Sequence, residues 1–127
     1  MVSGLEAARQ AARRAIESTY EGTCSVIQYQ SITDEKTRIT SQKEVLILEN
    51  QPCRLSFEKL SVVRQTETAA VPVQNVKLFL APEIPIWEGS KMIVTQQGIT
   101  AEYAASGVPA VYSTHQEIML QLFEGWA

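Results

Sequence analysis

The sequence has few of the residues from which catalytic and metal sites are built. Its 127 residues include one histidine, two cysteines and six dispersed glycines. One histidine excludes a site made of two or three histidines, and two separated cysteines cannot supply the CxxC pairs of a structural zinc. No phosphate-cradling loop of the GxxxxGK type is present, which argues against nucleotide hydrolysis. We therefore expect no metal, no cofactor and no enzymatic activity.

The chain also lacks an excess of basic residues and any long hydrophobic run. Eleven Lys and Arg face 14 Asp and Glu, giving a formal net charge of −3, whereas free nucleic-acid binders use a basic excess to neutralise phosphates. No apolar run approaches the roughly 20 residues of a membrane helix. The start, MVSGLEAARQAARRA, lacks the apolar centre of a secretory signal. We expect no membrane partner and synthesis in a cytoplasm.

A single cluster invites a catalytic interpretation. Ser113, Thr114 and His115, with Glu117 nearby, have the residue types of nucleophile, base and orienting acid. Residues this close along one strand are not expected to converge as a triad does. We expect Thr114 and His115 to shape the start of a strand by hydrogen bonding to backbone.

The first element predicted by the sequence is a helix over residues 3–20. Ser3 followed by Glu6 is a capping-box pair, and Glu21-Gly22 is expected to end the helix at a left-handed glycine. Small or apolar residues recur at three- and four-residue steps: Leu5, Ala8, Ala12, Ala15, Ile16 and Tyr20. This stripe is too thin to fold alone, so it should lie against the β body or against another subunit.

The β body is predicted over residues 23–60 and 73–124. In TCSVIQYQS, polar residues separate Cys24, Val26 and Tyr29, which are expected to face apolar surroundings as in a half-buried strand, and DEKT follows as an exposed turn. Residues 44–49 are apolar without alternation, which indicates a strand covered on both sides. A break is expected at residues 50–52.

Two further patterns complete the first half of this body and the start of the second. Cys53, Leu55 and Phe57 alternate with polar residues. In residues 73–80 the alternation places Val76, Leu78 and Leu80 on one side of the segment. Alternation of this kind, present in both segments, is typical of a half-buried strand.

Turn residues divide the remainder into short strands. Pro82, Pro85 and Glu88-Gly89 predict an irregular connection, Gly98 a hairpin, and Gly107 with its neighbours a corner. The expected strands are residues 91–95, 99–104 and 117–123. The sequence thus predicts one mainly β domain over residues 1–127: a small barrel or sandwich of six to seven strands, with an N-terminal helix and a long central loop.

The two cysteines fall in two different predicted strands. In a reducing compartment, Cys24 and Cys53 are expected to be small apolar core residues rather than a disulfide.

Several residues are candidates for contacts between subunits. Trp87, Phe123 and Trp126 could anchor a partner, because tryptophan and tyrosine carry much of the energy of interfaces. For Trp87, core or rim packing is an equal alternative, whereas Trp126, next to the chain end, should be covered by a neighbouring subunit. The arginines of the helix, Arg9, Arg13 and Arg14, are either a solvated face or salt-bridge donors to an acidic neighbour.

Three segments carry a family resemblance: PCRLSFEKL (residues 52–60), VKLFLAPEIPIWEGSKMIV (76–94) and SGVPAVYSTHQEIMLQL (106–122). Together they resemble the head-closure, or stopper, proteins of long-tailed phages and prophages of Gram-positive bacteria, also called head-tail connector or minor capsid proteins. In those relatives a helix, a "CRLS" strand, a proline-marked hairpin and a "THQE" start of the last strand follow in the same order. The resemblance covers nearly the whole chain.

The resemblance implies a ring of identical subunits below the portal and adaptor rings of a phage neck. Its partners would be the portal-side adaptor, a tail-completion or tail-tube protein, and packaged DNA only through the channel lumen. The location would be the virion neck, and host cytoplasm before assembly. A long loop near the middle of such chains can gate the channel. Here residues 61–72 are the candidate, and they could also form a β-ribbon. The predicted gate residues are Val62, Val63, Arg64, Gln65, Thr66, Glu67, Thr68, Ala69, Ala70 and Val71.

Two other functions remain open. A tail-completion or terminator protein of the same neck would share the ring but contact different neighbours. A small barrel of the oligonucleotide-binding type is the alternative from another class. It should show aromatics interleaved with Lys and Arg, for which residues 73–80 offer Lys77 and Phe79.

Overall fold

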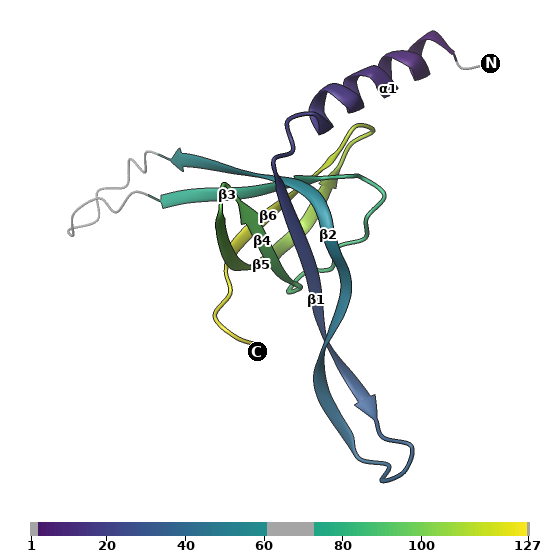
Figure 1. Cartoon of the computed structure of the whole chain (residues 1–127), viewed down its shortest axis with the longest axis vertical. Coiled ribbons are helices and arrows are strands. Elements are labelled where there is room, and N and C mark those ends of the chain that lie inside the picture. The colour runs from purple at the N-terminus through teal and green to yellow at the C-terminus, as the bar shows by residue number, and fades with distance from the viewer. Residues whose placement is uncertain (1–2, 61–72, 127) are drawn as a thin grey trace.

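The chain folds as a mainly β structure in which six antiparallel strands close into a barrel and one helix precedes them (Figure 1). The computed structural model describes residues 3–60 and 73–126. Its elements are α1 (Gly4–Glu17), β1 (Gly22–Thr33), β2 (Thr40–Leu60), β3 (Val73–Leu80), β4 (Lys91–Gln96), β5 (Ile99–Val111) and β6 (Gln116–Leu122). The order around the barrel is β1-β2-β3-β6-β5-β4, and pairing of β4 with β1 closes it. The predicted fold class is confirmed, in its barrel form with six strands.

Each strand gives the barrel core two residues spaced two apart. Side chains on a strand alternate between its faces, so such a pair points to the same side. The pairs are Cys24 and Val26, Cys53 and Leu55, Leu78 and Leu80, Met92 and Val94, Tyr103 and Ala105, and Ile118 and Leu120. The two cysteines are free and fully buried, as expected of core residues. The alternation read from residues 76–80 is confirmed by the burial of Leu78 and Leu80.

A buried glutamine fixes the connection between β3 and β4 to one end of the barrel. Gln116, at the start of β6, is fully buried. Its side-chain amide donates to the backbone carbonyls of Ala81 at 2.8 Å and Ile84 at 2.5 Å. Because a buried amide must find partners, this residue ties residues 81–84 to β6. The predicted irregular connection is confirmed, and its position is set by this contact.

The strands β1 and β2 extend beyond the barrel as a two-stranded ribbon, which projects from the lower end of the molecule in Figure 1. Its tip is the turn around Glu35, confirming the predicted exposed turn. The prediction that residues 44–49 are covered on both sides is wrong: Leu46 is 52% and Ile47 40% exposed. These residues pair only with β1, so no other strand is present to cover them.

The expected break at residues 50–52 is also absent, since β2 runs without interruption from Thr40 to Leu60. The irregularity is absorbed by bulges where β1 and β2 change register between Cys24 and Ile27. Asn50 has a φ of 56°, a left-handed conformation that asparagine tolerates better than most residues. Likewise, Gly107, with a φ of 74°, does not end a strand at a corner. It lies in a register shift within β5.

The helix α1 begins as predicted but ends earlier. The side chain of Ser3 accepts a hydrogen bond from the backbone N–H of Glu6 at 3.1 Å, which is the expected cap. The helix ends at Glu17, with Ser18 as its right-handed C-cap, so the prediction that Gly22 ends it is wrong. Gly22 instead begins β1 between two strands. A Cβ there would lie 3.0 Å from the Thr95 carbonyl oxygen and 3.3 Å from that of Cys53.

The hairpin between β4 and β5 confirms the turn predicted at Gly98. Gln97 and Gly98 have φ values of 53° and 75°, and two successive positive φ angles are typical of the tight turns that join antiparallel strands. Residues 61–72, which include every predicted gate residue, lie outside the described residues. The gate therefore stays a prediction.

Candidate functional site

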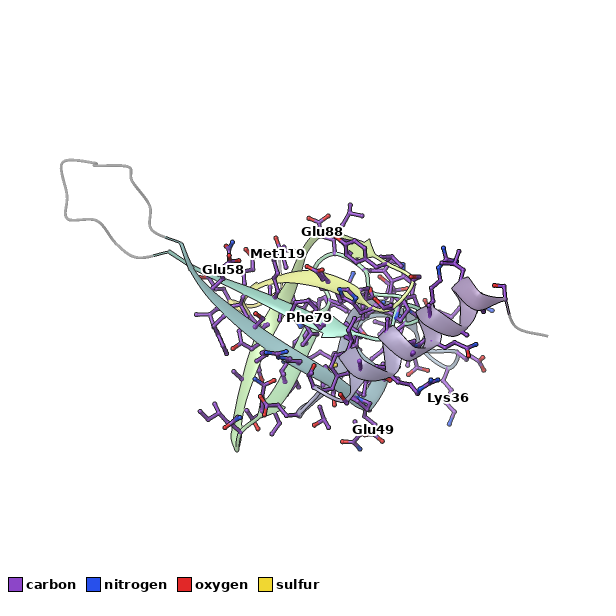
Figure 2. All side chains as sticks on the ribbon, turned by 90° about the horizontal axis from the view of Figure 1, so that it is seen from above. Lys36, Glu49, Glu58, Phe79, Glu88 and Met119 are labelled. Carbon is purple, nitrogen blue, oxygen red and sulfur yellow. The ribbon has the colours of Figure 1, made fainter. Side chains whose placement is uncertain are left out.

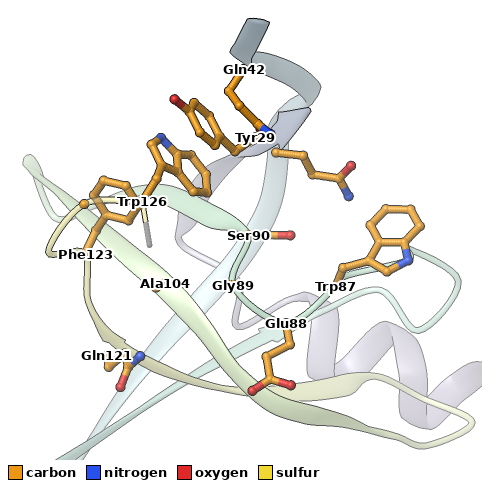
Figure 3. Close-up of a pocket in the computed structure, with 12 residues that line it drawn as sticks. Tyr29, Gln42, Trp87, Glu88, Gly89, Ser90, Ala104, Gln121, Phe123 and Trp126 are labelled. Atoms are coloured by element: carbon orange, nitrogen blue, oxygen red, sulfur yellow. The ribbon is translucent and has the colours of Figure 1, made fainter. Parts of the chain in front are cut away.

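An aromatic groove lies at the base of the β1–β2 ribbon (Figure 3). It has a volume of about 640 Å³. Its walls come from the ribbon, the β3–β4 connection, β5, β6 and the C-terminal tail. The lining residues are Gln28, Tyr29, Gln42, Trp87, Glu88, Gly89, Ser90, Ala104, Gln121, Phe123, Gly125 and Trp126.

One wall of the aromatic groove is a stack of rings. Trp126 lies flat on Tyr29, with ring centroids 4.9 Å apart and planes at 8°. Phe123 meets the same indole edge-on, at 5.0 Å and 74°. Such pairs contribute about 0.5–1.5 kcal/mol beyond the area that they bury. The C-terminal tail is thereby held against the ribbon of its own chain.

Charged groups fix this wall in place. The indole N–H of Trp126 donates to Glu44 Oε1 at 3.1 Å, and Lys91 Nζ lies 3.3 Å from the same oxygen. The ammonium group of Lys91 also sits 4.7 Å from the centroid of the Phe123 ring, a cation–π geometry. The hydrogen bond from Trp126, and then the one from Lys91, lower the pKa of the Glu44 carboxyl below its ordinary value. Glu44 therefore stays ionised at neutral pH.

The opposite wall is open. Trp87 is 53% exposed and faces the groove from the side away from Trp126 (Figure 3). The buried hydroxyl of Ser90 has no hydrogen-bond partner among the described residues. Glu88 carries the one charge of the lining. The lining thus consists of aromatic rings, amide side chains and small residues with this one carboxylate.

The arginines of α1 differ in their surroundings. Arg13 bonds Glu17 at 2.9 Å and Glu83 at 2.6 Å, so it ties the helix to the β3–β4 connection of the same chain. The hydrogen bond from Arg13 lowers the pKa of the Glu83 carboxyl. Arg9 and Arg14 are exposed on the projecting helix. The Glu17 partner could have been read from its position four residues after Arg13, whereas no sequence signal points to Glu83.

The structure brings part of the 113–117 cluster together, contrary to the sequence argument. Thr114 Oγ1 lies 2.8 Å from His115 Nδ1, and His115 Nε2 lies 3.0 Å from Glu117 Oε2. Ser113 is not part of this chain of bonds. Convergence is possible because residues 115 and 117 share one side of the strand and Thr114 lies in the bend before it. The sequence predicts hydrogen bonds from Thr114 and His115 to the backbone, whereas in the structure these side chains bond each other and Glu117.

Aromatic neighbours and an ion pair surround this histidine. His115 stacks on Tyr112 at 5.0 Å and lies 5.5 Å from Phe79, while Lys77 Nζ is 3.6 Å from Glu117. A cavity of about 340 Å³ lies beside it, below the end of α1. There the Tyr20 hydroxyl is buried without a partner in the described part of the chain, and burial raises its pKa to about 12.

The sequence placed Trp87, Phe123 and Trp126 together as partner-facing candidates, and the structure sets all three around one groove. It also shows that Trp126 is half-buried on its own chain, and the contact of this residue with another subunit stays a prediction. Tyr29, predicted to face the core, is 42% exposed and supports Trp126. Sequence reasoning missed Glu44, Lys91 and Ser90, since nothing local marks them.

Neither three metal-ligating side chains in one place nor a helix able to cross a bilayer occurs in residues 3–60 and 73–126.

Comparison with known proteins gives a single finding. No protein-family model matches the chain, and no curated protein matches it. A solved structure that resembles it is that of the phage-like element PBSX protein xkdH from Bacillus subtilis. The two are 12% identical with a TM-score of 0.47, over 77% of this chain and 90% of that one. A match at this identity and TM-score carries no argument about function.

Proposed function

We propose that this protein is a structural component of a phage neck, namely a head-closure or stopper protein. Copies form a ring below the portal and adaptor, retain the packaged DNA and offer a docking surface to the tail. The three segments that resemble such proteins support this role. The role needs no catalysis, metal or cofactor, because it depends on shape and on contacts between subunits.

The observation that carries the proposal is the uneven burial of apolar residues. The barrel encloses its core, yet α1 has no buried residue and the ribbon exposes apolar side chains along its length. The exposed ones outside the barrel core include Leu5, Ile32, Ile39, Leu46 and Ile47. We infer that these exposed side chains of α1 and the ribbon are covered in the assembled ring, since apolar surface that one chain leaves exposed can mark a site of protein association.

The shape of the molecule suits a ring. In Figure 1, α1 and the ribbon leave the barrel toward opposite ends of the long axis. A contact between two different patches of the same chain is heterologous and produces a closed ring if the rotation between copies closes. The barrel then supplies a rigid wall, while the arms reach neighbouring copies or the adjoining ring.

The gate is the finer part of the proposal. The last residue of β2 pairs with the first of β3, Leu60 with Val73, so the two strand ends that flank the predicted gate lie side by side. The apolar residues of the gate, such as Val62, Val63 and Val71, can meet those of other copies across the lumen. The net charge of −3 helps DNA to slide through without being gripped.

Deletion of the gene in its phage tests the proposal. We expect heads that package DNA, lose it and fail to join tails, and complementation in trans should restore infectious particles. Electron microscopy with a tagged chain should place it at the head–tail junction. Filled, stable heads with unjoined tails, and cross-links to the tail tube rather than the adaptor, would instead identify a tail-completion protein. Salt-sensitive binding to single strands in a gel shift would favour the oligonucleotide-binding barrel.

Shortening residues 61–72 tests the gate separately. Particles carrying the shortened segment should join tails but leak DNA beforehand. The matched control replaces the ribbon tip, residues 34–37, with a two-residue turn, and it should not cause leakage before tail joining. Normal DNA retention in the shortened variant would reject the gate and leave the ring intact.

A further inference from the structure

Both edges of the β1–β2 ribbon lack a neighbouring strand in the structure described. β1 pairs with β4 only from Thr23 to Ile27, so residues 28–33 have β2 on one side alone. β2 meets β3 only from Arg54 onward, so residues 40–52 have β1 alone. Each edge carries backbone N–H and C=O groups that can accept a further strand.

The β1 edge has none of the usual protection against strand addition. Residues 28–33 read QYQSIT, without a charge, a proline or a glycine, and these are the features that normally block an edge. A two-stranded ribbon is at best marginally stable in water by itself. The exposed side chains of Ile32 and Leu46 add apolar surface to it.

The aromatic groove lies where this edge begins. The chain before β4 turns from β1 toward β5: the N–H of Gly89 donates to Ala105 at 2.8 Å, and the N–H of Ala105 donates to Ser90 at 2.9 Å. This divergence leaves the space between Tyr29 and Ser90 that Figure 3 shows. An extended strand placed there would lie beside the β1 edge, at the spacing of about 4.8 Å that neighbouring strands keep, between the rings of Trp126 and Trp87.

We propose that the strand entering this groove is the β2 edge of a second copy, residues 40–45, added antiparallel to residues 28–33 of β1. In a ring all ribbons have the same orientation, and β1 and β2 run in opposite directions, so this contact is antiparallel. It joins two different edges, as a heterologous contact must. The inference rests on the proposed ring of copies and names the surface that closes it.

Charge favours a second copy as the occupant. The groove lining carries one charge, the exposed carboxylate of Glu88, which is labelled in Figure 2. The incoming strand carries Lys43 and Glu44. Glu44 is paired with Lys91 of its own copy, which leaves the exposed Lys43 as the charge offered to a neighbour. Neither Glu88 nor Lys43 is in an ion pair within the described residues. Lys43 of one copy can therefore pair with Glu88 of the next.

A photocross-link locates the contact. Gln30 is exposed on the β1 edge and is replaced by p-benzoylphenylalanine in the full chain; the matched control places the same group at exposed Glu58. After irradiation, the cross-linked dimer is digested with trypsin, which cleaves after Arg38, Lys43 and Arg54. We expect the probe at Gln30, and not at Glu58, to join the peptides of residues 39–43 or 44–54. Attachment to the β1 peptide would show a two-fold β1–β1 contact and overturn the inference.

Charge exchange gives an independent test by sedimentation of the purified protein over a range of concentrations. Glu88→Lys and Lys43→Glu should each weaken self-association about tenfold, and the double variant should restore it, because like charges at an interface are costly. Glu58→Lys is the control and should have no effect. Failure of the double variant to recover would count against the Lys43–Glu88 pair. Circular dichroism checks that every variant is folded.

The outcomes separate this inference from the proposed function. Self-association with no cross-link from Gln30 to the β2 peptides refutes the strand addition and leaves the ring standing. A wild-type chain that stays monomeric at every concentration, and is found in no multimeric neck, refutes both.

Discussion

The barrel and the ribbon share the strands β1 and β2, yet the two parts of these strands differ in what covers them. In the barrel part of β1, Cys24 and Val26 are fully buried, and Leu48 of β2 packs beside them. A few residues further on, the same strands expose Ile32 and Leu46. The residue types are similar. In β1 the difference comes from β4, which pairs with Thr23 to Ile27 and not with residues 28–33. In β2, Leu46 and Leu48 both precede the stretch that pairs with β3, and of the two only Leu48 packs against the barrel core. A strand pattern therefore indicates that a strand forms, and its neighbours decide whether that strand belongs to a core or a surface.

The barrel and the ribbon are expected to contribute to different properties, namely folding stability and association. The barrel supplies the free energy of folding, since each buried leucine-sized side chain contributes roughly 1.5–3 kcal/mol. The ribbon, the groove at its base and α1 supply surface for association. Mutations in the two regions should accordingly separate stability from assembly.

Truncation of a core leucine gives the largest expected effect. Leu78→Ala removes a side chain that is 0% exposed, and the cavity should lower the free energy of unfolding by about 2–5 kcal/mol. Leu46→Ala on the ribbon is the matched control and should cost less than about 0.5 kcal/mol. Urea unfolding followed by circular dichroism measures both. Equal losses would mean that the ribbon belongs to the cooperative core.

Substitution of Gly22 gives the next largest expected effect on stability. At Gly22 an added Cβ meets backbone oxygens of two neighbouring strands, Thr95 and Cys53. Backbone cannot move away cheaply, so Gly22→Ala should destabilise the barrel by about 1–3 kcal/mol. Gly4→Ala, in the first turn of α1 with no atom within 4 Å, should be neutral or slightly stabilising. Thermal unfolding compares the two, and similar melting temperatures would contradict this account of Gly22.

Removal of residues 126–127 should separate folding from association. The loss of the Trp126 stack on Tyr29 should cost about 1 kcal/mol and leave the barrel folded. Self-association should fall further, because one wall of the aromatic groove is gone. Trp87→Ala is the control for the opposite wall: it should reduce self-association without changing unfolding. If truncation lowered stability and assembly in equal measure, a role for Trp126 in the interface would be rejected.

The smallest expected effect is the pH dependence of α1 docking. Arg13 depresses the pKa of Glu83 below the ordinary 4.5. A depressed carboxyl pKa stabilises the folded chain above the unfolded pKa, and that stability is lost as pH falls through the folded value. Because Glu83 is 60% exposed, the contribution should stay below about 1 kcal/mol. The protection of the amides in the last turn of α1, measured relative to their intrinsic exchange rate at each pH, should fall below about pH 4.5, and Glu83→Gln should remove that dependence. Unchanged protection would show that the pair does not hold the helix.

Much of the fold could be predicted from local pattern. Alternation identified Cys53, Leu55, Leu78 and Leu80 as core residues. The turn at Gly98 could be predicted because glycine readily adopts the positive φ that such a turn requires. The errors arose where distant elements decide. The apolar run at residues 44–49 predicts a strand covered on both sides. That prediction fails because the residue types do not show how many strands lie beside the run, and only β1 does.

The site was predictable only as a set of residues. Tryptophan and phenylalanine marked Trp87, Phe123 and Trp126, but the pairing of Trp126 with Tyr29 joins residues 97 positions apart (126 minus 29). The Arg13–Glu83 ion pair and the contact of Glu44 with Lys91 have the same character. For the cluster at His115, the prediction that residues so close in sequence do not converge was wrong. The bend before β6 lets the side chains of Thr114, His115 and Glu117 meet.

The sequence by itself determined that the chain is mainly β, that Cys53, Leu55, Leu78 and Leu80 face the core, and that the chain turns near Glu35 and at Gly98, since these depend on steric preferences and on a two-residue period within one segment. Only the tertiary structure decided that the barrel closes through β1 and β4, that the ribbon is left uncovered and that four aromatic rings border one groove. Those properties depend on which distant segments lie side by side, and burial is a property of that arrangement rather than of any single stretch of residues.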